Sequence, residues 1–211
     1  MSTWVIVVAA GRGERFGGAK QYEQLGDRRV LDWSLQAARA VADGIVLVVP
    51  AEDVARAEEG TDAVVAGGAT RSASVRAGLA RVAKDAEVIV VHDAARPLAS
   101  ASLFESVVAA VHDGADAAVP GVAVPDTLKQ VRDVRVVATV ARDELVAVQT
   151  PQAFRADRLR EAHRGDPDAT DDAGLVEAIG GKVIVVPGDP RNRKLTTRDD
   201  LLAARALVNE R

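Results

Sequence analysis

The sequence predicts an α/β fold built on a doubly wound, mostly parallel sheet. Short β-branched runs alternate with stretches of helical periodicity along the 211 residues, and this alternation is typical of a parallel sheet. Several runs are continuously apolar, as expected for strands that are covered on both faces. Ligands of such sheets bind beyond the carboxyl ends of the strands, so we expect the functional residues there.

The individual elements follow from the same patterns. The expected strands are Trp4–Val8, Ile45–Val49, Ala63–Val65, Val88–Val91, Ala117–Val119 and Val183–Val186. The expected helices are Val30–Ala42, Ser72–Ala83, Leu103–His112, Asp171–Ile179 and Asp199–Asn209. Thr197 and Asp200 form a capping-box pattern before the last helix, with Asp in place of Glu. Gly180-Gly181 is a natural helix stop.

The stretch Val122–Val140 breaks this alternation. It contains two apolar runs joined by a polar turn at Arg132–Asp133, with no helix of comparable length between them. We therefore expect one domain over residues 1–211, with a protruding β-arm at about residues 122–142. Such a hairpin packs either on its own domain or on a partner chain, and the pattern leaves both open.

The composition excludes several classes of protein. The chain is 48% apolar and 27% charged, which is ordinary for a soluble globular domain. Its net charge of −4 argues against general nucleic-acid binding, and the lack of cysteine excludes disulfides and thiolate metal sites. No apolar run approaches the roughly 20 residues of a membrane span. The N-terminus enters a strand without a signal sequence, so we expect a cytoplasmic protein.

The most informative segment is the loop after the first strand. Small residues and then two cations follow this strand: Ala9, Ala10, Gly11, Gly13, Arg15 and Lys20. Glycines let the backbone approach an anion, and the cations neutralise its charge, so the loop is typical of a phosphate site. Phe16 stands where a dinucleotide fingerprint needs glycine, and Gly18 lacks the following Lys-Ser/Thr of a Walker A loop. The alternative is a plain βα turn with surface cations.

Further polar clusters follow other predicted elements. The glycines and hydroxyls of residues 67–75 would line a nucleotide or merely cap a helix. The pair Asp93 and Arg96 suits recognition of hydroxyls and phosphate, or forms a simple ion pair in a turn. The remaining clusters are Arg142 with residues 149–152, residues 170–172 and residues 192–196. The three histidines lack metal-ligand spacing, and His163 is expected at the surface.

Taken together, these motifs closely resemble those of the 2-C-methyl-D-erythritol 4-phosphate cytidylyltransferases, which use CTP in the non-mevalonate isoprenoid pathway. The resemblance runs from about Val5 to Leu207. Its specific part is an ordered set: HDAARP at 92–97, DTLK at 126–129, Arg142 before TPQ at 150–152, TDD at 170–172 and NRKLT at 192–196. The resemblance implies a Rossmann-like α/β domain and a β-arm that is exchanged across a homodimer.

The resemblance also implies a role for each matching residue. CTP would be bound by Ala9, Ala10, Gly11, Gly13, Arg15, Lys20, Gly68 and Ser74. The polyol phosphate would be bound by Asp93, Arg96, Thr127, Arg142, Thr150, Thr170 and Lys194. The catalytic cations would be Arg15, Lys20, Arg142 and Lys194, and Thr127 and Arg142 would reach the partner's site from the arm.

The implied reaction transfers CMP from CTP to 2-C-methyl-D-erythritol 4-phosphate, by direct attack of the substrate phosphate on the α-phosphorus. Pyrophosphate leaves, and no covalent enzyme intermediate is needed. The implied cofactor is Mg²⁺ or another divalent cation, held mainly by the CTP phosphates, and no residue of the chain is assigned as a metal ligand. The alternatives are a cytidylyltransferase for another polyol phosphate, such as ribitol 5-phosphate, and a non-catalytic nucleotide-binding regulatory protein.

The chain departs from the family pattern in the phosphate loop. Ala19 stands where the family often has proline, and Gly17 and Gly18 precede it. Proline would restrict this backbone, whereas the glycines leave it freer. We therefore expect the loop to be mobile until the nucleotide binds.

Overall fold

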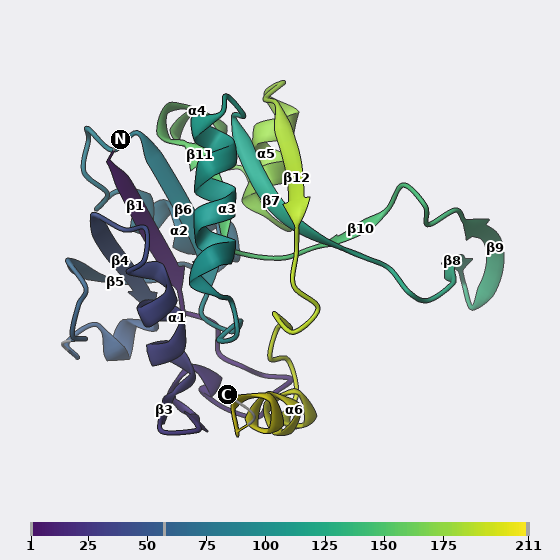
Figure 1. Cartoon of the computed structure of the whole chain (residues 1–211), viewed down its shortest axis with the longest axis horizontal. Helices are drawn as coiled ribbons and strands as arrows, with labels where there is room; N and C mark the ends of the chain where they lie inside the picture. The colour runs from purple at the N-terminus through teal and green to yellow at the C-terminus, as the bar shows by residue number, and fades with distance from the viewer. Residues whose placement is uncertain (1, 57, 210–211) are drawn as a thin grey trace.

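The computed structural model describes residues 2–56 and 58–209. Within these residues, an eight-stranded sheet forms the centre of the molecule, and helices cover both of its faces (Figure 1). The strand order is β10-β7-β11-β6-β1-β4-β5, with β12 paired to β7. The sheet is mostly parallel, as the sequence predicts.

All the predicted strands are present and run parallel to one another. They are β1 (Thr3–Val8), β4 (Gly44–Val49), β5 (Ala63–Ala66), β6 (Val88–Asp93), β7 (Ala117–Ala123) and β12 (Val183–Pro187). Two short strands that the sequence analysis did not predict, β10 (Val146–Val148) and β11 (Gln152–Arg155), run antiparallel to them. Because β11 lies between β6 and β7, it brings residues 149–152 beside the end of β6.

Successive side chains of β1 point to opposite faces of the sheet and meet different helices. Val5 and Val7 belong to a core shared with α1 (Val30–Ala38) and α3 (Ala101–His112). Ile6 belongs to a second core, shared with α2 (Arg71–Leu79), α4 (Ala156–Ala162) and α5 (Asp172–Ala178). Burial on both faces explains why these strands are continuously apolar.

A smaller third core lies beside the main sheet. There α6 (Arg198–Asn209) packs against the short hairpin of β2 (Gln24–Leu25) and β3 (Arg28–Arg29). Single turns of 3₁₀ helix occur at η1 (Lys20–Tyr22) and η2 (Ala51–Asp53). Across the described parts of the chain, no helix combines the length and apolar character needed to cross a membrane.

Most helix ends lie close to the predicted ones, with two helices ending early. The first helix was expected to continue to Ala42 but ends at Ala38, because the chain must turn before β4. Asp43 fixes that turn by exchanging hydrogen bonds of 2.8 Å with the backbone of Thr3 in both directions. Helix α2 likewise ends at Leu79 rather than Ala83. The seven residues of α4 were not predicted, since so short a helix shows little periodicity.

The predicted helix signals are confirmed where they can be followed atom by atom. The Thr197 hydroxyl accepts a hydrogen bond from the Asp200 amide at 3.3 Å, and the Asp200 carboxylate accepts one from the Thr197 amide at 2.8 Å. These reciprocal bonds make a capping box. After α5, Gly180 has φ of +75°, and the Gly181 amide donates to the Val176 carbonyl at 2.9 Å.

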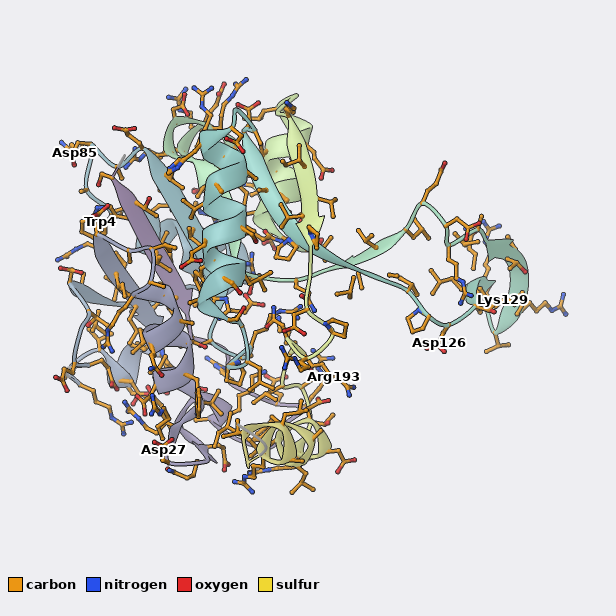
Figure 2. All side chains as sticks on the ribbon, viewed as in Figure 1. Trp4, Asp27, Asp85, Asp126, Lys129 and Arg193 are labelled. Atoms are coloured by element: carbon orange, nitrogen blue, oxygen red, sulfur yellow. The ribbon has the colours of Figure 1, made fainter. Side chains whose placement is uncertain are left out.

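The stretch that breaks the alternation forms an arm that projects away from the sheet (Figure 1). Its strands, β8 (Leu128–Arg132) and β9 (Arg135–Val140), pair antiparallel with each other. The turn lies at Asp133–Val134, one residue later than predicted, and both residues have positive φ. Figure 2 shows the labelled arm residues Asp126 and Lys129 far from the body of the chain. The start of the predicted stretch, residues 122–123, instead continues β7.

Truncation of Phe104 tests the core that α3 shares with the sheet. Phe104 is fully buried, so Phe104→Ala should lower the free energy of unfolding by about 3–5 kcal/mol through lost burial and a residual cavity. Urea unfolding followed by circular dichroism measures this loss. Leu202→Ala on α6 is the control, because that side chain is 59% exposed and its loss should change stability by less than about 0.5 kcal/mol. Equal losses in the two variants would contradict this packing.

Candidate active site

A cavity of about 770 Å³ lies beyond the carboxyl ends of the parallel strands. Three segments line it: the loop after β1, the loop after β5, and the end of β6 with the residues that follow it. Residues 194 and 196, which precede α6 in the chain, form a further part of its wall. The glycine loop and Asp93 therefore share one site, at the edge of the sheet where ligands of such folds bind.

The loop after β1 folds back on the carbonyl of Gly13. The amides of Phe16, Gly17 and Gly18 donate to this oxygen at 2.9, 2.8 and 3.3 Å. Gly13 itself has φ of +64°, and a Cβ there would collide with the Gly18 carbonyl, so this turn requires glycine. Phe16 is buried, with the Arg198 guanidinium 4.4 Å from its ring centroid. The mobility of this loop before nucleotide binding stays a prediction.

Lys20 begins the 3₁₀ turn η1, which directs its side chain across the cavity. Its Nζ donates to the Leu195 carbonyl at 2.8 Å. Burial lowers the pKa of Lys20, and repulsion from Lys194 and Arg15 lowers it further. Cations held this close repel one another, so an anion bound among them would relieve the repulsion.

The lining of the cavity is basic although the chain as a whole carries a net charge of −4. Its charged residues are the cations Arg12, Arg15, Lys20, Arg71 and Lys194 and the acids Glu14 and Asp93. A concave surface with this excess of positive charge concentrates anions. The site therefore suits a ligand with several negative charges, such as a triphosphate.

The loop after β5 forms a wall made of small residues. The Ser74 hydroxyl accepts from the Gly68 amide at 3.1 Å and donates to the Thr70 carbonyl at 2.9 Å. Thr70 in turn caps α2 through the Ala73 amide. A Cβ on Gly67 would collide with the side chain of Ala10, so the loops after β1 and β5 are in contact. Residues in this segment thus cap a helix, as predicted, and also line the cavity, while their contact with a nucleotide stays a prediction.

Asp93, at the end of β6, holds two cations. Its Oδ2 accepts from Lys194 Nζ at 2.7 Å, and its Oδ1 accepts from Arg71 Nε at 3.2 Å. Burial would raise the pKa of Asp93, but Arg71 and Lys194 outweigh it and hold that pKa well below its usual range. Asp93 is therefore ionised at neutral pH.

Three predicted substrate residues lie outside the lining of this cavity within the described chain. The Arg96 Nη1 donates to the Asn192 carbonyl at 2.9 Å. The Thr150 hydroxyl accepts from the Asp93 amide at 3.0 Å and lies 3.2 Å from His92 Nδ1. Thr170 is exposed in the loop before α5. Arg96 and Thr150 support the ends of strands in this arrangement, and the substrate contacts of all three stay predictions.

The two arm residues lie away from the cavity of their own chain. Thr127 and Arg142 are both exposed, and Arg142 donates to the Pro125 carbonyl within the arm. Figure 1 shows the arm extending away from the sheet edge that carries the loops of the cavity. Neither residue lines the cavity of its own chain in this structure, and their roles in the reaction stay predictions.

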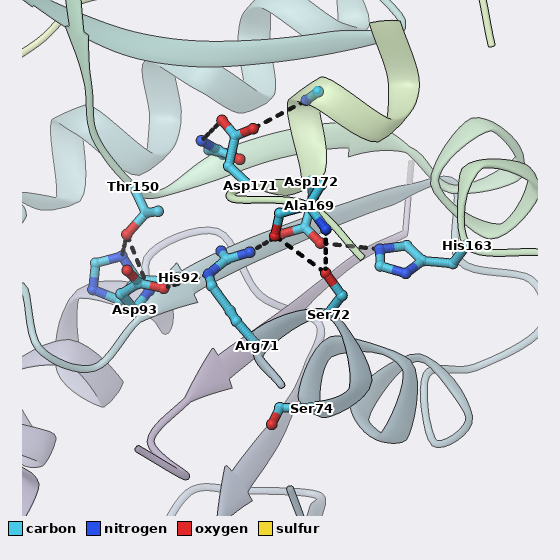
Figure 3. Close-up of polar contacts among 12 residues, drawn as sticks. Arg71, Ser72, Ser74, His92, Asp93, Thr150, His163, Ala169, Asp171 and Asp172 are labelled. Atoms are coloured by element: carbon cyan, nitrogen blue, oxygen red, sulfur yellow. Dashed lines mark hydrogen bonds and ion pairs between the residues drawn. The ribbon is translucent and has the colours of Figure 1, made fainter. Parts of the chain in front are cut away.

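Sequence reasoning missed a polar network behind Asp93 (Figure 3). Arg71 bridges Asp93 to Asp172, which also contacts His163. The prediction that His163 lies at the surface is wrong, since its side chain is only 3% exposed. Arg71 lies three residues after Gly68 in the loop after β5, and this position was a usable signal. No local sequence pattern could predict that Arg71 pairs with Asp172, because the two residues are 101 positions apart in the chain.

Comparison with known proteins agrees with this geometry. The profile of the 2-C-methyl-D-erythritol 4-phosphate cytidylyltransferase family matches residues 3–210. Relatives of that name from Frankia casuarinae and Rhodococcus opacus are both 47% identical, over 96% and 97% of this chain and 80% and 94% of their own lengths. The crystal structure of the Thermus thermophilus protein of the same name has a TM-score of 0.84 at 38% identity, and the match covers 99% of this chain and 100% of that one.

The ion pairs of Asp93 predict how stability depends on pH. Its pKa in the folded state lies well below the 3.8 of the free side chain, so the unfolded chain takes up the proton first as pH falls. The stabilisation by Asp93 is complete above about pH 4 and is lost as the solution becomes more acidic.

Urea unfolding between about pH 6 and about pH 3 measures this dependence. Asp93→Asn should cost roughly 3 kcal/mol at neutral pH, because it leaves the half-buried Arg71 with one carboxylate fewer, and its stability should fall less steeply with acid. Asp126→Asn on the exposed arm is the control and should keep the wild-type slope. If the free energy of unfolding falls with pH equally steeply in wild type and Asp93→Asn, the low pKa assigned to Asp93 is contradicted.

Proposed function

The chain belongs to the 2-C-methyl-D-erythritol 4-phosphate cytidylyltransferase family, and we propose that its cavity transfers CMP from CTP to 2-C-methyl-D-erythritol 4-phosphate. The products are 4-diphosphocytidyl-2-C-methyl-D-erythritol and pyrophosphate. The observation that carries the proposal is the cavity itself, where glycine loops and the cations Arg15, Lys20 and Lys194 surround a space suited to a nucleotide.

In the proposed complex, the small residues of the two loops hold CTP. Ala9, Ala10, Gly11 and Gly13 lie along the phosphates, because these four residues have small side chains or none and let the backbone amides approach the anion. Gly68 and Ser74 lie beside the cytidine, where the backbone of the loop after β5 presents hydrogen-bonding groups to the base. This placement leaves the α-phosphorus near the cations.

The proposed reaction is a direct displacement. A phosphate oxygen of the polyol phosphate attacks the α-phosphorus of CTP, and the bond to pyrophosphate breaks. Both reactants are anions, so their mutual repulsion contributes to the barrier. Lys20, Arg15 and Lys194 offset this repulsion and the charge that develops in the transition state. The attacking phosphate is already deprotonated near neutral pH, so the reaction needs no general base.

We infer that a divalent cation, such as Mg²⁺, enters with the CTP phosphates. Among residues 2–56 and 58–209, no group of three His, Asp or Glu side chains is arranged to hold a metal ion. Both Asp93 oxygens are engaged by cations of the chain. The donor set therefore fits a metal ion carried mainly by the nucleotide, whose charge would reduce that of the triphosphate.

We further propose that the arm completes the site of a second copy in a homodimer. The arm exposes apolar side chains to solvent: four of its valines are each more than half exposed, namely Val131, Val134, Val136 and Val137. Contact with another chain would cover this surface. Thr127 and Arg142 would then approach the partner's cavity and add a cation beside the attacking phosphate. Because the reaction consumes CTP, the cytoplasm is the proposed location.

The first test compares acceptors by measuring pyrophosphate release with CTP and Mg²⁺. The wild-type protein should turn over 2-C-methyl-D-erythritol 4-phosphate and not ribitol 5-phosphate. Lys20→Ala should lower kcat about 100- to 1,000-fold, as for the loss of one donor to a developing charge. Lys84→Ala is the control, because Lys84 is exposed and outside the cavity lining. Turnover of ribitol 5-phosphate alone would contradict the proposed acceptor, and no turnover of either compound would contradict the proposed activity.

The arm is tested by mixing two inactive variants. Lys20→Ala removes a cation of the cavity and Arg142→Ala removes one of the arm, so co-expression should create mixed dimers with one intact site. We expect roughly a quarter of wild-type activity, because half of the dimers are mixed and half of their sites are complete. Co-expressing Lys20→Ala with Lys194→Ala should restore nothing, since both residues line the same cavity. Equal activity of the two mixtures would contradict sharing of sites.

A further inference from the structure

A chain of charged side chains extends from the exposed Lys194 at the cavity wall to the buried Asp172 and His163 in the layer of α2 and α5. Asp93 contacts Lys194 on one side and Arg71 on the other, at 2.7 and 3.2 Å. Arg71 Nη1 continues to Asp172 Oδ2 at 2.7 Å. Asp172 Oδ1 then lies 2.9 Å from His163 Nε2. Figure 3 shows how Arg71 reaches between the two carboxylates.

The charges along this chain balance only when Asp172 is included. Lys194 and Arg71 are the two cations, and Asp93 and Asp172 are the two carboxylates. Because Arg71 is shared, Asp93 presents one oxygen to it and keeps the other for Lys194. Without the charge of Asp172, Arg71 and Lys194 would compete for a single carboxylate.

His163 holds the far end of the chain. A carboxylate can only accept, so His163 Nε2 must carry the proton that points to Asp172. The other ring nitrogen, Nδ1, is buried and has no hydrogen-bond partner within the described residues. His163 and Arg71 thus each hold one oxygen of the fully buried Asp172 carboxylate, and the contact fixes the orientation of both the carboxylate and the imidazole.

The backbone around this chain is tied down as well. The Ser72 hydroxyl accepts from the Ala169 amide at 3.2 Å, and Arg76 Nη1 donates to the Pro167 carbonyl at 2.7 Å. These bonds join α2 to the segment that leads into α5. The first residue of α2, Arg71, is therefore held in a constant position relative to the first residue of α5, Asp172.

We propose that Asp172, oriented by His163, is a positioning residue for the transfer reaction. Asp172 holds one end of the Arg71 guanidinium, so that Arg71 engages only one oxygen of Asp93 and the other accepts from Lys194. This arrangement fixes the position of the Lys194 ammonium group, which contacts the attacking phosphate in the proposed reaction. This inference rests on the proposed function, and it adds two residues that do not line the cavity.

Kinetics of Asp172→Asn separate positioning from binding. This variant keeps the shape of the side chain and removes its charge. We expect kcat to fall at least tenfold while the KM for CTP changes less than about twofold, with a smaller change of the same kind in His163→Asn. Asp116→Asn is the matched control, because Asp116 also pairs with an arginine, but its partner Arg158 does not line the cavity, whereas Arg71 does. Equal kcat values for Asp172→Asn and this control would overturn the proposal.

A double-mutant cycle tests whether Asp172 acts through Lys194. If it does, Asp172→Asn should slow the Lys194→Ala variant less than about twofold, because the group that it positions is already gone. A general loss of structure would instead multiply with the effect of Lys194→Ala. Full multiplication in variants that retain the wild-type melting temperature would overturn the proposal.

Amine labelling of the folded protein tests the same link without turnover. Lys194 is 42% exposed, so an amine-reactive reagent can reach it, and its pairing with Asp93 keeps the ammonium engaged. Asp172→Asn should raise the labelling rate of Lys194 at least about threefold relative to Lys84 in the same sample. If Asp172→Asn does not fold, His163→Asn should show a rise in the same direction.

These measurements distinguish the two proposals. If the wild-type protein turns over neither acceptor, but Lys194 is labelled faster in Asp172→Asn than in wild type, the proposed function is overturned and the link from Asp172 to Lys194 is kept. Active wild-type protein with unchanged Lys194 labelling in the folded variants would overturn the positioning and keep the function.

Discussion

The active-site arrangement depends on one buried carboxylate, Asp93, and the two cations that it holds. Lys194 reaches Asp93 from the segment before α6, and Arg71 reaches it from the start of α2. The pair with Lys194 joins residues 101 positions apart in the chain and the pair with Arg71 joins residues 22 positions apart, so Asp93 connects the end of β6 to the segment before α6 and to the start of α2. A carboxylate among so many cations does not attract an anionic substrate. It gives the cations fixed positions from which they can act on one.

The positions of the cations would be of little use without the small residues beside them. Gly13 permits a turn that a side chain would block, and Gly67 lets the loop after β5 approach Ala10. The cavity is therefore lined both by loops of small residues and by charged side chains. This combination is typical of sites that bind polyphosphates, because amides and cations together replace the water around the anion.

The arm is the part of the chain on which the proposed homodimer depends. A hairpin of two strands is marginally stable alone, and the valines of β8 and β9 are exposed where most apolar side chains of this chain are buried. The pairing of β10 with β7 fixes where the arm leaves the body. Its projection and its open apolar surface are both consistent with a structure that is completed by a second copy.

Local sequence determined the parallel strands and most of the helices, and it predicted the chemical type of the site. Continuous β-branched runs predicted all the parallel strands, since burial on both faces demands them. The glycine loop and its cations predicted a phosphate site, because few other chemistries need those residue types together. The capping box at Thr197 and the stop at Gly180 were also readable, because both signals act within a few residues.

Only the tertiary structure decided which side chains meet. It placed β11 between β6 and β7, which no local pattern of residues 152–155 indicates. It buried His163 against Asp172 and joined both to Asp93 through Arg71. It also directed Arg96 to the Asn192 carbonyl rather than into the cavity. Sequence patterns report local geometry, whereas these contacts depend on how distant strands and helices pack, and packing is a property of the whole chain.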